Sequence, residues 1–187
     1  MKKVWMLTIV VTSLFAERLS VDTEAITKAH NTLRAKHKVA PLIYTQALED
    51  KAVLWGRDLQ EEKGCRMVHS HGDTGENLYW ASASKSANAK DKKGQWIWHS
   101  TLQKVSEQEV VQAWYDEIAD YDYETNSCQE GKMCGHFTQV VWNTTTEVGC
   151  AAFACDDRSQ VWVCEYAPAG NVSVRHLNGK VEKLKPY

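Results

Sequence analysis

Two histidines and two glutamates are the side chains in this sequence that offer chemistry. His69 and Glu76 flank a glycine-rich loop, Glu117 ends a segment with one apolar face, and His136 begins a run rich in β-branched residues. Two neutral imidazoles can bind a divalent transition metal such as zinc, while carboxylates can accept the second ring N–H or balance the metal charge. The four residues form no local motif, and a lone His or Glu in such a context is more often a hydrogen-bonded structural residue. Residue type alone leaves both roles open.

The other common catalytic signatures are absent from the sequence. There is no GxSxG nucleophile elbow, no HExxH metalloprotease motif and no phosphate-binding loop. The six cysteines suggest three disulfides in an oxidising compartment, which would leave no thiol as a nucleophile. A zinc site made of cysteines is disfavoured because no CxxC pair exists and the nearest spacings are five and six. Six cysteines allow fifteen pairings, and the residues alone do not choose among them.

Two helices are predicted in the first third of the chain after residue 16. The first begins at Asp22 or Thr23 and runs to about His37, because its apolar residues repeat at helical spacing. Residues 38–44 contain a proline and are expected to be extended. The second helix begins at about Thr45 and is expected to bury one face, which carries Leu48, Ala52, Trp55 and Leu59.

The later elements change from helix to strand. Residues 81–95 are small or charged, with four lysines, and are predicted to form a mobile surface loop. Ser106 and Glu109 form a capping-box pattern that starts a third helix, whose face carries Val110, Trp114 and Ile118. Strands are expected at 136–142, 147–154 and 160–166. Helices first and strands later within one domain indicate an α+β fold.

Composition and charge narrow the class of protein. The chain has 187 residues, enough for one domain, and its eight Trp, seven Tyr and three Phe argue against disorder. Its net charge of −2 makes a nucleic-acid binder unexpected. Residues 1–16 combine Lys2 and Lys3 with an apolar stretch and Ala16, which predicts a cleaved signal peptide and a secreted, extracellular protein. Cleavage there would remove two lysines and no acidic residue, so the net charge of the mature chain would be 20 − 24 = −4.

Four ordered segments resemble the sequence signatures of the CAP superfamily, which comprises cysteine-rich secretory proteins, antigen five and plant pathogenesis-related class-one proteins. The resemblance is nearest to the plant branch. It implies a disulfide-stapled, single-domain, three-layer α-β-α sandwich with a mainly antiparallel central sheet and an open cleft. The CAP domain would span 23–171 and be followed by a tail at 172–187. The segments are HNTLR (30–34), GENL (75–78), GHFTQVVW (135–142) and VCEYAPAGN (163–171).

The resemblance also assigns residues to roles. It implies a cleft tetrad of His69, Glu76, Glu117 and His136, with His71 as a competitor that is less well spaced from Glu76. A zinc-like cation would bind the two histidines, with the glutamates behind them, and binding would be lost below about pH 6. A hydrogen-bonded cluster without metal is the alternative, and zinc is not expected to be needed for folding. The implied disulfides are Cys65–Cys155, Cys128–Cys134 and Cys150–Cys164.

Other polar residues are expected to be structural. His30, Asn31 and Arg34 lie together on the first helix and are predicted to attach it to the sheet. Gln139 and Asn171 are expected to hold buried backbone by hydrogen bonds.

The chain departs from the plant pattern in two places. Residues 81–105 form an enlarged segment with Trp96 and Trp98, which are expected to fold back on the core; the alternative is a basic, aromatic rim that meets lipid headgroups. Plant relatives release a short C-terminal peptide near the proline of this signature. The segment from Pro168 onward has 20 residues here, longer than that pattern, which puts such release in doubt.

The expected function is a non-enzymatic secreted binder of sterols or fatty acids with a defence, antimicrobial or host-interaction role at membrane surfaces. The aromatic residues are expected to line its apolar groove. A metal-assisted hydrolase or peptidase that uses the tetrad is one alternative. A module that signals by binding a receptor protein through its loops is another.

Overall fold

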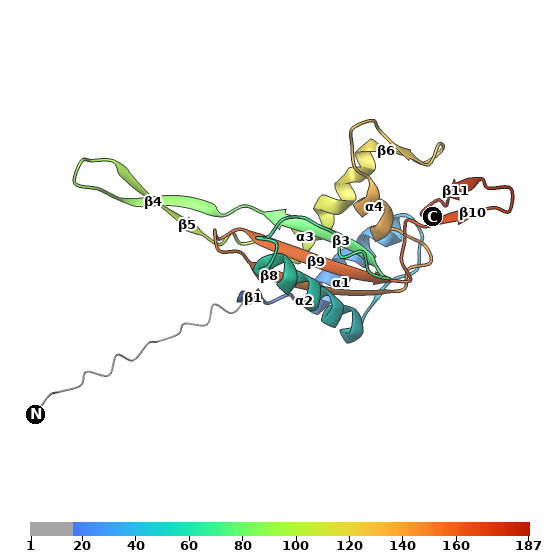
Figure 1. Cartoon of the computed structure of the whole chain (residues 1–187), viewed down its shortest axis with the longest axis horizontal. Helices are drawn as coiled ribbons and strands as arrows, with labels where there is room; N and C mark the ends of the chain where they lie inside the picture. The colour runs from blue at the N-terminus through green and yellow to red at the C-terminus, as the bar shows by residue number, and fades with distance from the viewer. Residues whose placement is uncertain (1–16) are drawn as a thin grey trace, which may run out of the picture.

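The computed structural model describes residues 17–187, and the predicted signal peptide lies outside them (Figure 1). Its helices are α1 (Thr23–Lys36), α2 (Gln46–Glu61), α3 (Glu107–Tyr115), the 3-10 helix η1 (Asp116–Asp120) and α4 (Gly135–Val140). The central sheet contains β1 (Glu17–Leu19), β2 (Ile43–Tyr44), β3 (Gly75–Ala81), β8 (Glu147–Ala154) and β9 (Gln160–Ala167). Paired short strands lie outside it: β4 (Ser84–Lys90) with β5 (Trp96–Thr101), β6 (Tyr121–Asp122) with β7 (Ser127–Cys128), and β10 (Ser173–Arg175) with β11 (Val181–Lys183).

The central sheet is mainly antiparallel. Its strands follow the order β1-β8-β9-β3, and β2 pairs with β8 in the parallel direction. Two of the three predicted strands coincide with β8 and β9.

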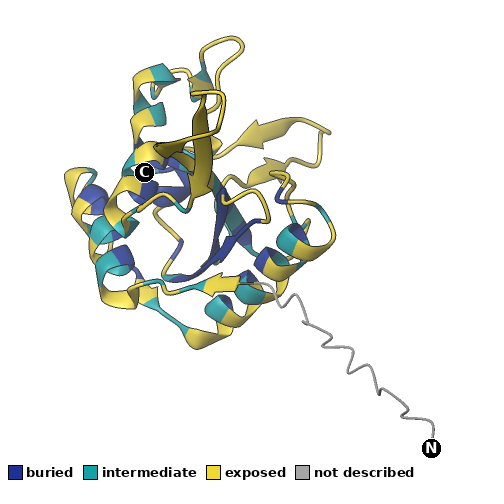
Figure 2. Cartoon of the chain, turned by 90° about the vertical axis from the view of Figure 1, so that its left-hand side faces the viewer, coloured by how far each residue is buried: buried dark blue, intermediate teal, exposed yellow. Residues whose placement is uncertain are grey.

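Helices cover both faces of the sheet, which explains why nearly every residue of β8 and β9 is buried (Figure 2). Alternate residues of β9 point to opposite faces: Trp162 and Tyr166 pack with α1, α3 and α4, while Val161 and Val163 pack on the side of α2. The α2 backbone approaches β8 so closely that a Cβ on Gly149 would lie 2.1 Å from the Glu49 nitrogen. The predicted three-layer α-β-α sandwich is confirmed.

The predicted helix starts agree with the structure. Asp22 caps α1 by accepting the backbone N–H of Glu24 and Ala25, and Ser106 and Glu109 form the capping box of α3. Two details differ from the prediction. In α2 the fully buried position beside Ala52 and Leu59 is Gly56, with Trp55 half-buried. Helix α3 ends at Tyr115, so Ile118 lies in η1.

The strand predicted at 136–142 is wrong. The structure forms the short helix α4 there, and every residue from Phe137 to Trp142 is buried. A short apolar run that is buried all round has no periodicity by which a strand is told from a helix. The helix is stabilised by Glu117, whose carboxylate accepts the first backbone N–H groups, those of His136 and Phe137.

The mobile loop predicted at 81–95 is also wrong, as is the packing of Trp96 and Trp98 on the core. Strands β4 and β5 form a long hairpin that projects from the domain, and both tryptophans are exposed (Figure 1). Its turn is organised by Asp91, whose carboxylate accepts the backbone N–H groups of Lys93 and Gln95. A hairpin held by such local contacts needs no apolar core. The small and charged residues of 81–95 therefore give no sign of a strand.

Three disulfides are present, and they are the pairs that the family resemblance implies. Cys65–Cys155 ties the segment after α2 to the end of β8, Cys128–Cys134 closes the segment before α4, and Cys150–Cys164 bridges directly opposed positions of β8 and β9. The residues described include no free cysteine.

The polar residues of α1 bind the rest of the fold, although not all of them contact the sheet. His30 donates from Nδ1 to the Ile26 carbonyl at 2.8 Å, and its Nε2 accepts from the Tyr166 hydroxyl on β9 at 2.8 Å. Arg34 is fully buried and donates to four carbonyl oxygens, those of Ala40, Val140, Trp142 and Thr145. It therefore holds the segment that joins α4 to β8.

Three other side chains hold loop backbone. Asn31 exchanges two hydrogen bonds with the backbone of Leu42. Gln139 accepts the N–H of Gly170 at 2.9 Å, and Asn171 donates to the Gly135 carbonyl at 2.9 Å. The Leu42 and Gly170 groups lie outside helices and strands, and the Gly135 carbonyl belongs to the first residue of α4, so all three side chains satisfy backbone groups beyond the reach of the sheet ladder.

The C-terminal residues return to the domain. After β11, Pro186 is buried and its carbonyl accepts the N–H of Asn143. The Tyr187 ring stacks on Tyr123 with ring centroids 4.8 Å apart and lies 4.3 Å from His37. Among the helices of residues 17–187, none has the length and apolar character that crossing a membrane requires.

Candidate functional site

The first half of the candidate site joins the segment after α2 to the edge strand β3. His69 Nδ1 lies 2.5 Å from Oε1 of Glu76, and the backbone N–H of Ser70 also donates to this carboxylate. The hydrogen bond to Glu76 raises the pKa of His69, and burial opposes it. Burial would raise the pKa of Glu76, but the hydrogen bonds from His69 and Ser70 outweigh it and lower the pKa. The pair therefore favours a charged carboxylate beside a basic imidazole.

The second half joins η1 to the start of α4. His136 Nδ1 lies 2.6 Å from Oε1 of Glu117, and Oε2 of the same carboxylate accepts the backbone N–H groups of His136 and Phe137. The indole of Trp114 is nearly parallel to the His136 ring, with centroids 6.4 Å apart. Glu117 thus fixes both the ring and the helix that carries it.

The two halves meet at one cavity of about 300 Å³. Its lining includes both imidazoles and Glu76, while Glu117 lies behind His136. Asn77 joins the walls by donating to the His136 carbonyl at 3.1 Å. His71, the competing candidate, is exposed and does not line this cavity.

One charged residue beside the site was not singled out from the sequence. Glu165 on β9 lies directly opposite Glu76 on β3, is 2% exposed and accepts a hydrogen bond from Thr74 at 2.5 Å. Burial raises the pKa of Glu165 to about 7, the charge of Glu76 adds to the increase, and the hydrogen bond from Thr74 opposes it. A glutamate inside the apolar run QVWVCEYA is the signal that would have found it, because buried carboxylates are rare.

The donor set at the cavity fits a cation held by two imidazoles. Each ring has its Nδ1 engaged by a carboxylate, which leaves Nε2 as the ligating atom, as in many metal-binding histidines. Within residues 17–187, no cluster of three or more His, Cys, Asp or Glu side chains is placed to bind a metal ion. A cation here would take two protein ligands and complete its coordination with water or a ligand.

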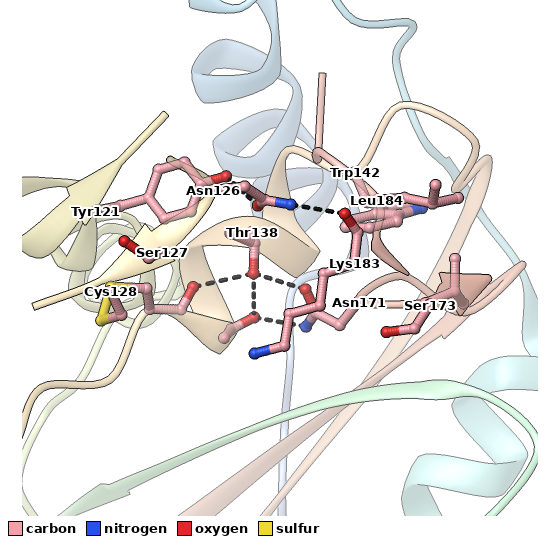
Figure 3. A pocket seen from close by; sticks show the side chains of 13 residues that line it. Tyr121, Asn126, Ser127, Cys128, Thr138, Trp142, Asn171, Ser173, Lys183 and Leu184 are labelled. Carbon is pink, nitrogen blue, oxygen red and sulfur yellow. Dashed lines mark hydrogen bonds between the residues drawn. A yellow bond between two sulfur atoms is a disulfide. The ribbon is translucent and has the colours of Figure 1, made fainter. Parts of the chain in front are cut away.

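A second cavity of about 290 Å³ shares Gly135 and Asn171 with the first in its lining. Figure 3 shows the side chains that surround it. Thr138 donates to the Asn171 side chain at 2.6 Å, and Asn126 donates to the Lys183 carbonyl of the C-terminal hairpin. Its polar wall groups are thus largely paired with one another.

A third hollow is a groove of about 560 Å³ between α1 and α3. Ala25, Ala29 and Leu33 line it at a spacing of four on α1, with Lys28 and Lys36 beside them. Residues of α3 form the opposite wall: Glu107, Gln108 and Gln112, after Ser106. The aromatic residues expected to line an apolar groove do not line this one.

Comparison with known proteins agrees with the fold and the motifs. Residues 27–166 match the family model described as CAP, the cysteine-rich secretory protein family. The chain is 36% identical over 158 residues to pathogenesis-related protein PRMS of Zea mays, which covers 84% of this chain and 77% of that protein. It is 37% identical over 144 residues to pathogenesis-related protein 1B of Nicotiana tabacum, covering 77% of this chain and 73% of that protein.

Solved structures show the same fold at lower identity. Hookworm platelet inhibitor matches with a TM-score of 0.58 and 20% identity, covering 94% of this chain and 81% of that chain. Venom allergen-like protein 4 of Schistosoma mansoni matches with a TM-score of 0.55 and 22% identity, covering 80% of this chain and 90% of that chain. With the family model covering most of the chain and plant relatives above 30% identity, this chain belongs to the CAP family of cysteine-rich secretory proteins, with pathogenesis-related proteins of plants among its relatives.

Proposed function

We propose that this chain is a secreted, non-enzymatic defence protein that binds a fatty acid in the groove between α1 and α3. Family membership and three disulfides support an extracellular location. The pathogenesis-related relatives support the defence role. The observation that carries the ligand assignment is the groove itself.

The groove combines the two features that a fatty acid needs. Its volume of about 560 Å³ falls within the range of small-molecule pockets. Ala25 and Ala29 offer apolar surface for a hydrocarbon chain, with the largely buried Leu33 one turn further on, because residues four apart share a helix face. Lys28 and Lys36 supply positive charge for the carboxylate. A sterol has no carboxylate to pair with these lysines and is expected to bind more weakly.

Binding of radiolabelled palmitate and cholesterol to the oxidised, signal-free protein tests the proposal. Ala29→Phe fills the groove and is expected to reduce palmitate binding by about tenfold or more, since the bulky ring displaces the chain. Ala35→Phe on the exposed side of the same helix is the control and is expected to bind normally. Saturable palmitate binding that is equal in wild type and Ala29→Phe would place the ligand elsewhere, and no saturable binding would refute the proposal.

The two histidine–glutamate pairs favour a second candidate function, a metal-assisted hydrolase. His69 and His136 would hold a zinc-like cation, which when bound supplies an activated water and a Lewis acid. Glu76 and Glu117 would keep the rings oriented by accepting hydrogen bonds from their Nδ1–H groups, and Glu76, which lines the cavity, would accept a proton there.

Calorimetric titration with zinc at pH 7.5 tests the metal site first. Wild type is expected to bind one ion, and His136→Ala is expected to lose about tenfold or more in affinity, because only one imidazole remains. His71→Ala is the matched control. Equal zinc binding by wild type and His136→Ala would exclude this site. Hydrolysis of a peptide library that disappears with a chelator and with Glu117→Gln would favour the enzyme over the carrier, whose palmitate binding survives both.

A further inference from the structure

The β4–β5 hairpin, residues 84–101, carries a large amount of unpartnered apolar surface. Every side chain in it is exposed except Ala87, which is half-buried. Trp96 is 55% exposed and Trp98 64% exposed, and Ile97 between them is also exposed. The hairpin extends away from the central sheet, so no other part of the described chain covers it (Figure 1). Clustered exposed apolar residues of this kind mark an interaction surface.

The strand register places the tryptophans and two lysines on one face of the hairpin. Lys90 lies opposite Trp96, Ala87 opposite Trp98, and Lys85 opposite Ser100. Directly opposed residues of antiparallel strands point to the same side. The Lys90 ammonium lies 4.7 Å from the centre of the Trp96 ring, which agrees with this register. This face therefore carries two aromatic groups from β5 beside two cationic groups from β4.

The hairpin also differs in charge from the rest of the chain. It contains four lysines and one acid, Asp91, for a net charge of 4 − 1 = +3, whereas the whole chain has −2, which leaves −5 for the remainder. The Asp91 carboxylate is occupied by two backbone N–H groups of the turn. Lys92 and Lys93 lie in that turn, at the end of the hairpin farthest from the sheet (Figure 1).

We propose that the β4–β5 hairpin docks this protein on the surface of an anionic lipid bilayer. Tryptophan prefers the interface between headgroups and acyl chains, where its ring is buried and its N–H stays hydrated. Lysines beside it pair with anionic headgroups. A polyanion such as a sulfated polysaccharide would use the lysines but would leave the tryptophans in water. A bilayer engages both kinds of side chain, which is why the arrangement favours it.

Flotation of the oxidised protein with vesicles tests the proposal. Binding is expected to phosphatidylcholine vesicles that contain phosphatidylserine, and to be much weaker with phosphatidylcholine alone. The double variant Trp96→Ser/Trp98→Ser and the quadruple variant with Lys85, Lys90, Lys92 and Lys93 changed to Gln are each expected to lose about tenfold or more in vesicle binding. Thermal unfolding of both variants verifies that they fold.

Two matched controls separate this surface from the others. Leu177→Ser/Lys180→Gln replaces one exposed apolar residue and one lysine in the β10–β11 hairpin and is expected to bind vesicles like wild type. Ala29→Phe is also expected to bind vesicles like wild type. Fatty-acid binding and vesicle binding are therefore tested separately, and the failure of either proposal leaves the other standing. Vesicle binding that survives either hairpin variant overturns the proposal. Dextran sulfate binding that requires the lysines but not the tryptophans, without vesicle binding, would assign a polyanion instead.

Discussion

The central sheet and the β4–β5 hairpin are both antiparallel β-structure, but different interactions hold their strands. In the sheet, β8 and β9 are covered on both faces and fixed by partners far away in the chain, such as the His30–Tyr166 hydrogen bond, which spans 136 residues. In the hairpin, the pairing of Ser84 with Thr101 is the longest-range contact, and the Asp91 turn sets the register. The fold thus depends on the sheet, while the hairpin is an addition that leaves the fold unchanged.

That comparison also separates two ways in which candidate functional side chains are oriented. The cleft histidines are oriented by carboxylates from other elements, so their geometry depends on the integrity of the whole domain. The tryptophans of the hairpin are oriented by the strand they lie on. Variants in the sheet are therefore expected to change stability and site together, whereas variants in the hairpin change binding alone.

The largest loss of stability is expected from removal of the Cys65–Cys155 disulfide. This bond joins positions 90 residues apart, and the chain-entropy model gives a loss of about 4–5 kcal/mol for a loop of that length. Cys128–Cys134 spans 6 residues, and the same model gives about 2 kcal/mol. Urea unfolding of Cys65→Ala/Cys155→Ala and Cys128→Ala/Cys134→Ala measures both. Equal losses would mean that loop length, and therefore chain entropy, does not determine how much each disulfide stabilises the protein.

Replacement of Arg34 by methionine is expected to cost about 3–4 kcal/mol, because four carbonyl oxygens, three of them in buried hydrogen bonds, would lose their donor together. Arg57→Met on the exposed face of α2 is the control and is expected to stay within about 0.5 kcal/mol of wild type. Urea unfolding decides the matter. A loss for Arg34→Met no greater than the control's would remove Arg34 from the set of long-range contacts that define the sheet.

A smaller, pH-dependent effect is expected from Glu165→Gln. The pKa of Glu165 is raised in the folded state to about 7, so the folded protein holds a proton that the unfolded chain releases above about pH 4.5. Stability from this residue therefore falls as the pH rises from about 4.5 to 7. The variant removes that fall and is expected to gain about 1–3 kcal/mol relative to wild type between pH 5 and pH 8.

His30 acts in the opposite direction, so the wild-type profile alone is uninformative. Burial lowers the pKa of His30 to about 4, which means that stability falls as the pH drops from about 6.5 to 4. Melting temperatures of wild type, Glu165→Gln and the exposed control Glu130→Gln at pH 5, 6.5 and 8 isolate the Glu165 contribution. A difference between wild type and Glu165→Gln that does not change with pH would show that Glu165 is ionised throughout.

The sequence predicted what depends on local pattern and family motifs, and missed what depends on tertiary contacts. The starts of α1 and α3 follow from the capping residues Asp22 and Ser106, and β8 and β9 from short runs that contain β-branched and aromatic residues between turn residues. The pattern of 136–142 predicts a strand where the structure has helix α4, because the support for that helix comes from Glu117, in another element.

The same distinction applies to the candidate site. His69, Glu76, Glu117 and His136 came from motif resemblance, not from spacing, since the pairs lie on four different segments. Glu165 was missed because its role is visible only when strand register places it opposite Glu76. The β4–β5 hairpin was missed for the contrary reason: its interactions are local, but its composition is that of a loop.

The smallest effect on stability is expected from the hairpin, and it is the sharpest test of the comparison. Trp96→Ser/Trp98→Ser removes two large aromatic side chains that contact little besides their own hairpin, so the free energy of unfolding is expected to change by less than about 0.5 kcal/mol. Trp162→Ala removes one tryptophan from the sheet, where it is 2% exposed, and is expected to cost about 3–5 kcal/mol. Hydrogen exchange is expected to agree, with β5 amides exchanging far faster than those of β9, because no helix covers them. A loss above about 1 kcal/mol in the double variant, or slow exchange in β5, would mean that the tryptophans pack on the domain in solution. The contrast between sheet and hairpin would then be wrong. The tryptophans would also not be available for bilayer docking.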